Sequence, residues 1–149
     1  MRVGECCNTS VVIAQRSTSI VEAAQLMREF HVGALVVVDP DGGTARPVGM
    51  VTDRDLVVEI LAEEAPASGI TVGDIMSSDL VTAGWDDELL DTLDRMRSEG
   101  VRRIPVVGAT GALMGILAAD DVLDLLAEAV GRVPQLVRHQ QNIEAQRRT

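Results

Sequence analysis

The segment with the clearest chemistry runs from Gly49 to Asp55 and reads Gly-Met-Val-Thr-Asp-Arg-Asp. Here apolar residues typical of a strand give way to polar residues typical of a helix start, where backbone N–H groups are unpaired and an anion is favoured. The Thr52 hydroxyl could contact a phosphate there, and the two carboxylate oxygens of Asp55 could accept hydrogen bonds from both hydroxyls of a ribose. The same Thr-x-x-Asp spacing also fits a helix N-cap with an acidic residue at the third helical position. The segment therefore predicts a nucleotide contact, a helix cap, or both from the same atoms.

Composition limits the classes of protein to which the chain could belong. Hydrophobic residues make up 46% of its 149 residues, with one Trp, one Phe and no Tyr, so the core must be aliphatic. All 13 basic residues are Arg, and 23 acidic residues give a net charge of −10. That charge argues against a nucleic-acid groove and against an anionic membrane surface, but a few local arginines could still hold a small anion.

The expected compartment follows from what the sequence lacks. No apolar run approaches the roughly 20 residues of a membrane span, and the amino terminus shows no signal-peptide pattern. The two cysteines, Cys6 and Cys7, are adjacent, and a bridge between them would be badly strained. We therefore expect a cytoplasmic protein without a disulfide framework.

The chain contains an internal repeat. When the sequence is shifted so that Val3–Glu5 falls on Val72–Asp74, identical residues also meet further along. The matches in the same register are Val12 with Val81, Ala14 with Ala83, Met27-Arg28 with Met96-Arg97, Val32 with Val101, and Val37-Val38 with Val106-Val107; after a short deletion Gly49 meets Gly115 and Asp55 meets Asp121. Two copies, rather than a long array, indicate a tandem pair whose halves bury each other's apolar faces.

Each copy predicts the same order of elements. In both, a short strand precedes an amphipathic helix, two almost continuously apolar strands joined by a turn, and a closing helix. The expected strands are Val11–Ala14, Ala34–Val38 and Val48–Val51, then Leu80–Ala83, Ile104–Val107 and Leu113–Leu117; the closing helices are Asp53–Glu63 and Ala119–Val130. We divide the chain into repeat 1 (1–65), repeat 2 (66–131) and a terminal segment (132–149), which we expect to be a final helix or a loosely held, solvated tail.

This repeat resembles a tandem pair of CBS domains, also called a Bateman module. The features that carry the resemblance are the element order, the strand entry Val101-Arg102-Arg103-Ile104-Pro105-Val106-Val107 and the Gly49–Asp55 segment, in two copies over about residues 3–130. The resemblance implies an α+β fold in which two β-α-β-β-α repeats pack sheet to sheet about a pseudo-twofold axis, leaving two clefts. In many members these clefts hold AMP, ADP, ATP, S-adenosylmethionine or reduced nicotinamide cofactors, and the modules commonly form homodimers.

Positions carried over from the family give a first cleft. Asp55 would bind the ribose, Thr52 with Arg54 the phosphate, and apolar residues the base. The expected lining is Gly33, Ala34, Met50, Thr52, Arg54 and Asp55 from repeat 1, with Met76, Asp79, Val81, Val101 and Arg102 from repeat 2. Core packing is the competing reading for Met50 and Met76.

The second cleft departs from the family pattern. Asp121 keeps the ribose position, but Ala118 stands where a Ser or Thr is expected, and Asp120 replaces the arginine. Arg102 and Arg103 lie at the phosphate-facing strand entry of the family, where they would either contact phosphate or form salt bridges with nearby acids. We expect this cleft to be weak, empty, or selective for an uncharged adenosine group.

The functional expectation is a sensor rather than an enzyme. Only two histidines, His31 and His139, are present, there is no Lys, and no nucleophile, acid–base pair or metal cluster stands in a plausible arrangement. We expect an adenosine nucleotide as ligand, AMP, ADP or ATP first, with Mg²⁺ in the case of ATP. The partners would be a second copy of the chain and an unidentified protein, with neither nucleic acid nor membrane. The alternative is a ligand-free dimerisation module with vestigial clefts.

Overall fold

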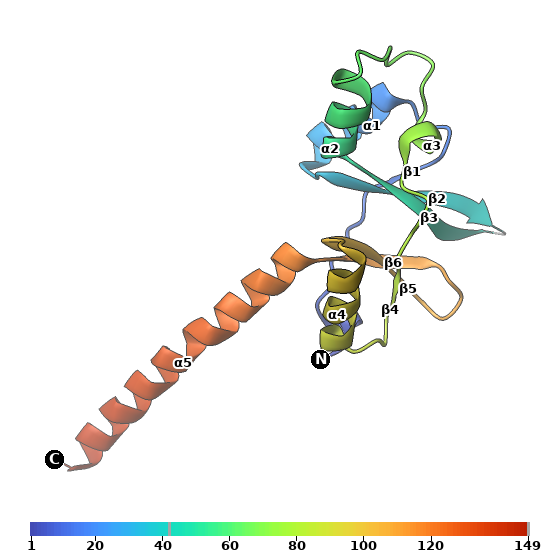
Figure 1. Cartoon of the computed structure of the whole chain (residues 1–149). Helices are drawn as coiled ribbons and strands as arrows, with labels where there is room; N and C mark the ends of the chain where they lie inside the picture. Colours follow the sequence, from blue (N-terminus) through green and yellow to red (C-terminus); the bar gives the residue numbers. More distant parts are fainter. Residues whose placement is uncertain (42, 149) are drawn as a thin grey trace.

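A computed structural model describes residues 1–41 and 43–148 and confirms a mixed α+β fold with two small sheets (Figure 1). Repeat 1 contains η1 (Val3–Glu5, a 3-10 helix), β1 (Ile13–Ala14), α1 (Ile20–Phe30), β2 (Ala34–Asp41), β3 (Thr44–Thr52), α2 (Asp53–Asp55) and η2 (Leu56–Leu61, a π-helix). Repeat 2 contains α3 (Val72–Ile75), β4 (Ala83–Gly84), α4 (Leu89–Glu99), β5 (Arg103–Val107), β6 (Leu113–Ala118) and α5 (Ala119–Arg148).

The two sheets have the same topology. In each, a short first strand runs parallel to the second strand, which pairs with the third strand antiparallel, in the orders β1-β2-β3 and β4-β5-β6. The sheets lie face to face, with α1 and α2 on the outer side of the first sheet and α4 on the outer side of the second (Figure 1). The strands are covered on both faces, which explains their nearly continuous apolar sequence.

The first hairpin is longer than its sequence predicts. The segment from Asp39 to Gly43 predicts a turn, but β2 continues to Asp41 and β3 begins at Thr44, while Gly42 lies outside the described residues. Pro40 pairs with Ala45 in the register of this hairpin. Proline lacks an N–H group and is tolerated at such an end of a sheet, where no further strand needs the hydrogen bond.

Each repeat receives a leading segment from the other repeat. Residues 2–8 are the start of repeat 1 in the chain, yet Val3 is fully buried in the core of repeat 2 with Leu89, Ile104 and Leu117. The Val3 amide donates to the Asp87 carbonyl at 2.9 Å. The amino-terminal segment is therefore part of the second hydrophobic core.

Residues 71–77 make the reciprocal exchange. Val72 is buried in the core of repeat 1 with Leu35 and Val51, and its amide donates to the Thr18 carbonyl at 2.8 Å. Each leading segment also forms a two-bond bridge to the last strand of the repeat that receives it. Asn8 exchanges backbone hydrogen bonds of 2.9 and 2.8 Å with Ile116, and Ser77 exchanges bonds of 3.0 and 3.4 Å with Met50.

The terminal segment is helical. The expected closing helix of repeat 2 does not stop near Val130 but continues through Gly131 and Pro134 to Arg148 as one helix, α5. This helix extends away from both sheets (Figure 1). Within the described residues, no helix combines the length and the apolar character needed to cross a membrane.

Replacing Gly49 by Ala tests the contact between β3 and the second leading segment. A Cβ at this position would lie 2.7 Å from the Ser77 carbonyl oxygen and 2.7 Å from the Met76 sulfur, so the backbone of one of the two segments must move. We expect Gly49→Ala to lower the free energy of unfolding by about 1–3 kcal/mol in urea denaturation. Gly131→Ala is the control, because a Cβ there meets nothing within 4 Å, and Ala in place of Gly inside a helix should not lower the stability. Equal midpoints for Gly49→Ala and the parent would show that this contact does not constrain the fold.

Candidate functional site: two clefts between the repeats

The first cleft combines the helix start of repeat 1 with the strand entry of repeat 2. It has a volume of about 380 Å³. Its lining comes from three parts of the chain. They are the end of β3 and α2 (Met50, Thr52, Arg54 and Asp55), the end of the second leading segment with the residues after it (Ser77, Asp79, Leu80 and Val81), and the chain from the end of α4 into β5 (Gly100 to Ile104). The lining therefore combines apolar side chains with charged ones, as a nucleoside phosphate would require.

Thr52 and Asp55 form a helix cap and also face the cleft. The Thr52 amide donates to Asp55 Oδ2 at 2.8 Å, and the Asp55 amide donates to Thr52 Oγ1 at 3.1 Å. Both residues are half-buried and both line the cleft. Among the described residues no side chain or amide donates to Asp55 Oδ1, and the Thr52 hydroxyl still has its own proton to donate. The two readings of the Thr-x-x-Asp spacing are thus geometrically compatible.

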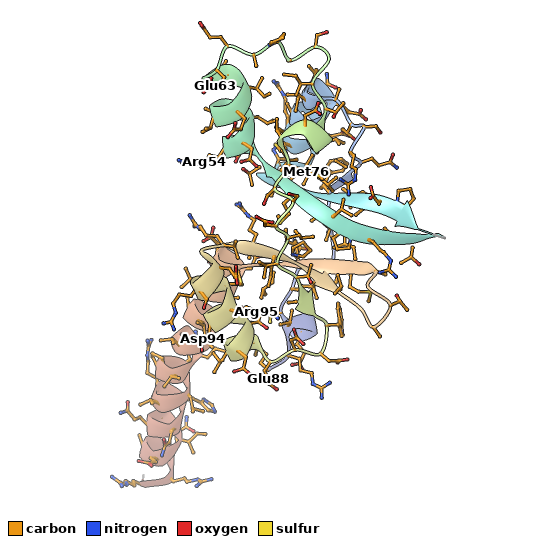
Figure 2. All side chains as sticks on the ribbon, turned by 45° about the vertical axis from the view of Figure 1, so that its right-hand side comes forward. Arg54, Glu63, Met76, Glu88, Asp94 and Arg95 are labelled. Carbon is orange, nitrogen blue, oxygen red and sulfur yellow. The ribbon has the colours of Figure 1, made fainter. Side chains whose placement is uncertain are left out.

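The arginines near the first cleft differ in their exposure and in whether they form an ion pair. Arg54 lies on α2 (Figure 2), and it is exposed at the lining of the first cleft. Arg102 forms an ion pair with Asp120 at 2.9 Å, with 76% and 60% of the two side chains exposed, so this pair contributes little to stability. Arg103 is half-buried, lines both clefts, and has no ion-pair partner among the described residues. Arg103 is therefore the cation best placed to meet an anion in either cleft.

The second cleft repeats this construction with the repeats exchanged. It is smaller, at about 190 Å³, and combines the strand entry of repeat 1 with the helix start of repeat 2. It is lined by Asn8, Ser10, Val11, Val12, Val32, Gly33, Ala34, Arg103, Ile116, Ala118, Asp120 and Asp121. Its lining holds two carboxylates and the shared Arg103, and Asp120 is paired with Arg102, so the lining offers less positive charge to a phosphate than that of the first cleft.

Three predicted positions need correction. Gly33 and Ala34 line the second cleft rather than the first, because each strand entry faces the helix start of the other repeat across the two stacked sheets. Met76 lines neither cleft. It packs against the core of repeat 1, beside α3 (Figure 2), which is the alternative that the sequence left open. Met50 does line the first cleft.

The internal repeat relates the lining residues of the two clefts to each other. Asp79 and Val81 were predicted, and the structure places both in the first cleft together with Ser77 and Leu80. The same shift that aligns the repeats maps these four positions onto Asn8, Ser10, Val11 and Val12, which line the second cleft. Gly100 and Ile104, adjacent to predicted residues, complete the first cleft.

The two cysteines are not among the residues that line either cleft. In the described part of the chain, no three His, Cys, Asp or Glu side chains stand close enough to hold a metal ion. Cys6 and Cys7 are half-buried against the core of repeat 2. Burial raises the pKa of both thiols, and the neighbouring Cys7 and Glu5 raise the pKa of Cys6 further, so both thiols are weak nucleophiles at neutral pH.

Comparison with known proteins agrees with this architecture. The family model described as "CBS domain" matches residues 3–62 and 72–128. The chain is 31% identical over 140 residues to the CBS domain-containing protein YhcV of Bacillus subtilis, covering 93% of this chain and 96% of YhcV. It is 32% identical over 123 residues to protein MK0525 of Methanopyrus kandleri, covering 83% of this chain but only 61% of that protein.

A solved structure extends the comparison to the fold. The CBS domain pair of protein MJ0100, crystallised in complex with 5'-methylthioadenosine and S-adenosyl-L-methionine, is 25% identical to this chain. The match covers 85% of this chain and 99% of the MJ0100 chain, with a TM-score of 0.73. The face-to-face arrangement of the two sheets is thus shared with a known domain pair.

Replacing Thr52 separates its capping role from any contact with a ligand. Thr52→Ala removes the acceptor for the Asp55 amide, and we expect it to lower the free energy of unfolding by about 1 kcal/mol. Thr52→Ser keeps the hydroxyl and should retain most of this stability. Chemical denaturation of both variants without added ligand is the measurement. If Thr52→Ala matched the parent, the cap would contribute nothing, and the cleft would be the remaining role for this hydroxyl.

Proposed function

Because the chain belongs to the CBS domain family, we propose that it is a regulatory module that binds an adenosine nucleotide in the first cleft. The observation that carries the proposal is the meeting in one cleft of Thr52 and Asp55 from repeat 1 with Arg103 from repeat 2. A ligand that contacts all three bridges the two repeats. Its occupancy then changes how the repeats are held against each other.

The geometry supports a specific orientation of the nucleotide. Asp55 Oδ1 accepts hydrogen bonds from the ribose hydroxyls, because the other oxygen is occupied by the Thr52 amide. The phosphate lies toward the Thr52 hydroxyl and Arg103, with exposed Arg54 within the same lining. The base packs against the apolar residues of the lining, which include Leu80, Val81, Val101 and Ile104.

The ligand class follows from the charges in this cleft. Three arginines accompany two carboxylates, Asp55 and Asp79, so AMP, ADP or ATP fits better here than in the second cleft. With ATP, Mg²⁺ would arrive bound to the phosphates, since a Mg²⁺ ion is commonly held by one or two carboxylates together with substrate phosphates. S-adenosylmethionine remains a second class of ligand, supported by its presence in the related MJ0100 domain pair, and NADH is a third.

The proposed output is conformational rather than chemical. A ligand shifts an equilibrium between two arrangements only by its difference in affinity for them. Residues from both repeats line each cleft, so any change in their relative placement changes the contacts with the ligand. We propose that the signal is read by a second copy of the chain or by a protein partner, and that the module itself does not catalyse a reaction.

One observation favours the alternative of a ligand-free dimerisation module. The second cleft lacks a hydroxyl at Ala118 and carries Asp120 and Asp121. If the first cleft also binds nothing, both clefts are vestigial. The two candidates therefore differ in a single measurable property, which is ligand binding at the first cleft.

A binding screen tests the proposed function. We expect at least one of AMP, ADP, ATP with Mg²⁺, S-adenosylmethionine or NADH to raise the melting temperature, and a ligand at 100 times its Kd adds about 2.7 kcal/mol. Asp55→Asn keeps an oxygen for the cap and removes the charge, so calorimetry should show binding weakened roughly tenfold to a hundredfold. No shift with any of these ligands, confirmed by calorimetry, would support the dimerisation module instead.

Replacing Arg103 tests the assignment of the phosphate. Arg103→Gln should weaken binding of AMP or ATP about tenfold or more, while binding of uncharged 5'-methylthioadenosine stays within about twofold, because only a phosphate gains a charge-assisted hydrogen bond. The matched control is Arg97→Gln, which makes the same change in net charge at an exposed position on α4, paired only locally with Asp94. Equal losses for charged and uncharged ligands would place Arg103 away from the phosphate.

A further inference from the structure

The helix α5 exposes a continuous apolar stripe that no described residue covers. Leu123, Leu126, Val130, Val133 and Val137 are all exposed and recur at alternating intervals of three and four residues. This spacing is the a and d pattern of a helix that packs along a second helix. Leu136, also exposed, widens the stripe. Only Val122, in the first turn, is fully buried against the body.

The composition of α5 also indicates that its outer half needs a packing partner. Gly131 and Pro134 lie inside the helix. Relative to Ala they disfavour a helix interior by about 1 and about 3 kcal/mol, and Pro134 cannot donate the hydrogen bond to the Val130 carbonyl. An isolated, solvated helix has little to offset these terms. Burial of the apolar stripe is the available compensation.

The charges along α5 indicate which partner covers the apolar stripe. Its inner half, residues 119–130, carries four acidic residues and no Arg, whereas its outer half, residues 131–148, carries four Arg and a single Glu. Two copies in antiparallel orientation place each acidic half beside a basic half, and a twofold axis satisfies both pairs at once. Parallel copies would place like charges together. The apolar stripe runs through both halves, so a purely acidic or purely basic partner would match only one of them.

The net charge of the rest of the chain also favours contact between two copies through α5. Residues 1–118 carry 18 acidic residues against nine Arg, so two bodies repel each other. Residues 119–148 carry five acidic residues against four Arg, so contact through α5 meets the least repulsion. The basic end of each helix, with Arg147 and Arg148, then points toward the acidic body of the other copy.

We propose that α5 pairs antiparallel with α5 of a second copy of this chain, about a twofold axis near Val130. At this position of the axis Leu123 of one copy lies opposite Val137 of the other, and the two Val130 residues meet at the centre. The helix is about 45 Å long at 1.5 Å per residue, which is enough for the stripe to be covered over most of its length. This pairing is independent of whether the clefts bind a nucleotide.

Sedimentation analysis of the full chain tests the association. The parent should be a dimer at micromolar concentration, and Val130→Asp should raise the dimer Kd at least tenfold. Val130 is 69% exposed, so the substitution leaves the body intact, which circular dichroism and any ligand-induced thermal shift would verify. Gln135→Asp is the matched control, because it adds the same charge on the opposite side of the helix and should leave the Kd within a few-fold. A monomeric parent, or a dimer unaffected by Val130→Asp, would overturn the proposal.

Disulfide trapping tests the orientation. In a chain with Cys6 and Cys7 replaced by Ala, Leu123→Cys mixed with Val137→Cys should form a cross-linked heterodimer under mild oxidation. Each variant alone should cross-link at least tenfold more slowly. Faster self-cross-linking of Leu123→Cys would indicate parallel helices and overturn the antiparallel arrangement. Retained dimerisation without any cross-link in the mixture would place the contact on another surface and also overturn it.

Discussion

The exchange of leading segments is the constraint on which the rest of the structure depends. Val3 completes the core of repeat 2 and Val72 completes the core of repeat 1, so neither core is complete without chain from the other half. Two backbone bridges, Asn8 with Ile116 and Ser77 with Met50, then fix each leading segment against a strand. The repeats consequently cannot separate without opening both cores. The close approach at these bridges also requires glycine at 49 and 115, where a Cβ would meet a carbonyl oxygen at 2.7 and 2.8 Å.

This exchange also determines the composition of the clefts. A leading segment crosses to the other repeat and then returns to its own first strand, so the chain after it passes along the boundary between the sheets. Residues such as Asp79 and Val81 therefore line the first cleft, with Ser10 and Val12 at the equivalent positions of the second. Equivalent backbones with different side chains make the two clefts unequal. Arg103 lines both clefts. An anion that binds Arg103 in one cleft would therefore leave the carboxylates of the other cleft with less compensating positive charge.

Sequence reasoning predicted the family, the α+β class and the element order, because an internal repeat doubles each periodic signal. It placed Gly33 and Ala34 in the wrong cleft, because adjacency along one repeat does not show which surface the other repeat covers. It did not decide whether the terminal segment is a helix or a tail, because Gly131 and Pro134 are strong local signals against a helix. The structure shows that this segment continues the helix α5 to Arg148. The length of the first hairpin was missed for a related reason, because Pro40 and the glycines after it read as a turn.

Comparison of the two helix starts shows whether the fold needs the cap formed by Thr52 and Asp55. In repeat 1 the pair caps a short helix that passes at once into the π-helical turns of η2. In repeat 2 the corresponding helix begins at Ala119, directly after Ala118, without that hydroxyl, yet it is the longest helix described. The backbone junction is supported in both repeats by the same contact, from the Asp53 amide to the Gly33 carbonyl and from the Ala119 amide to the Arg102 carbonyl. Since this contact forms with or without the side-chain cap, the fold does not require a hydroxyl at the junction. The proton of the Thr52 hydroxyl and Oδ1 of Asp55 take no part in the cap, and both residues line the first cleft.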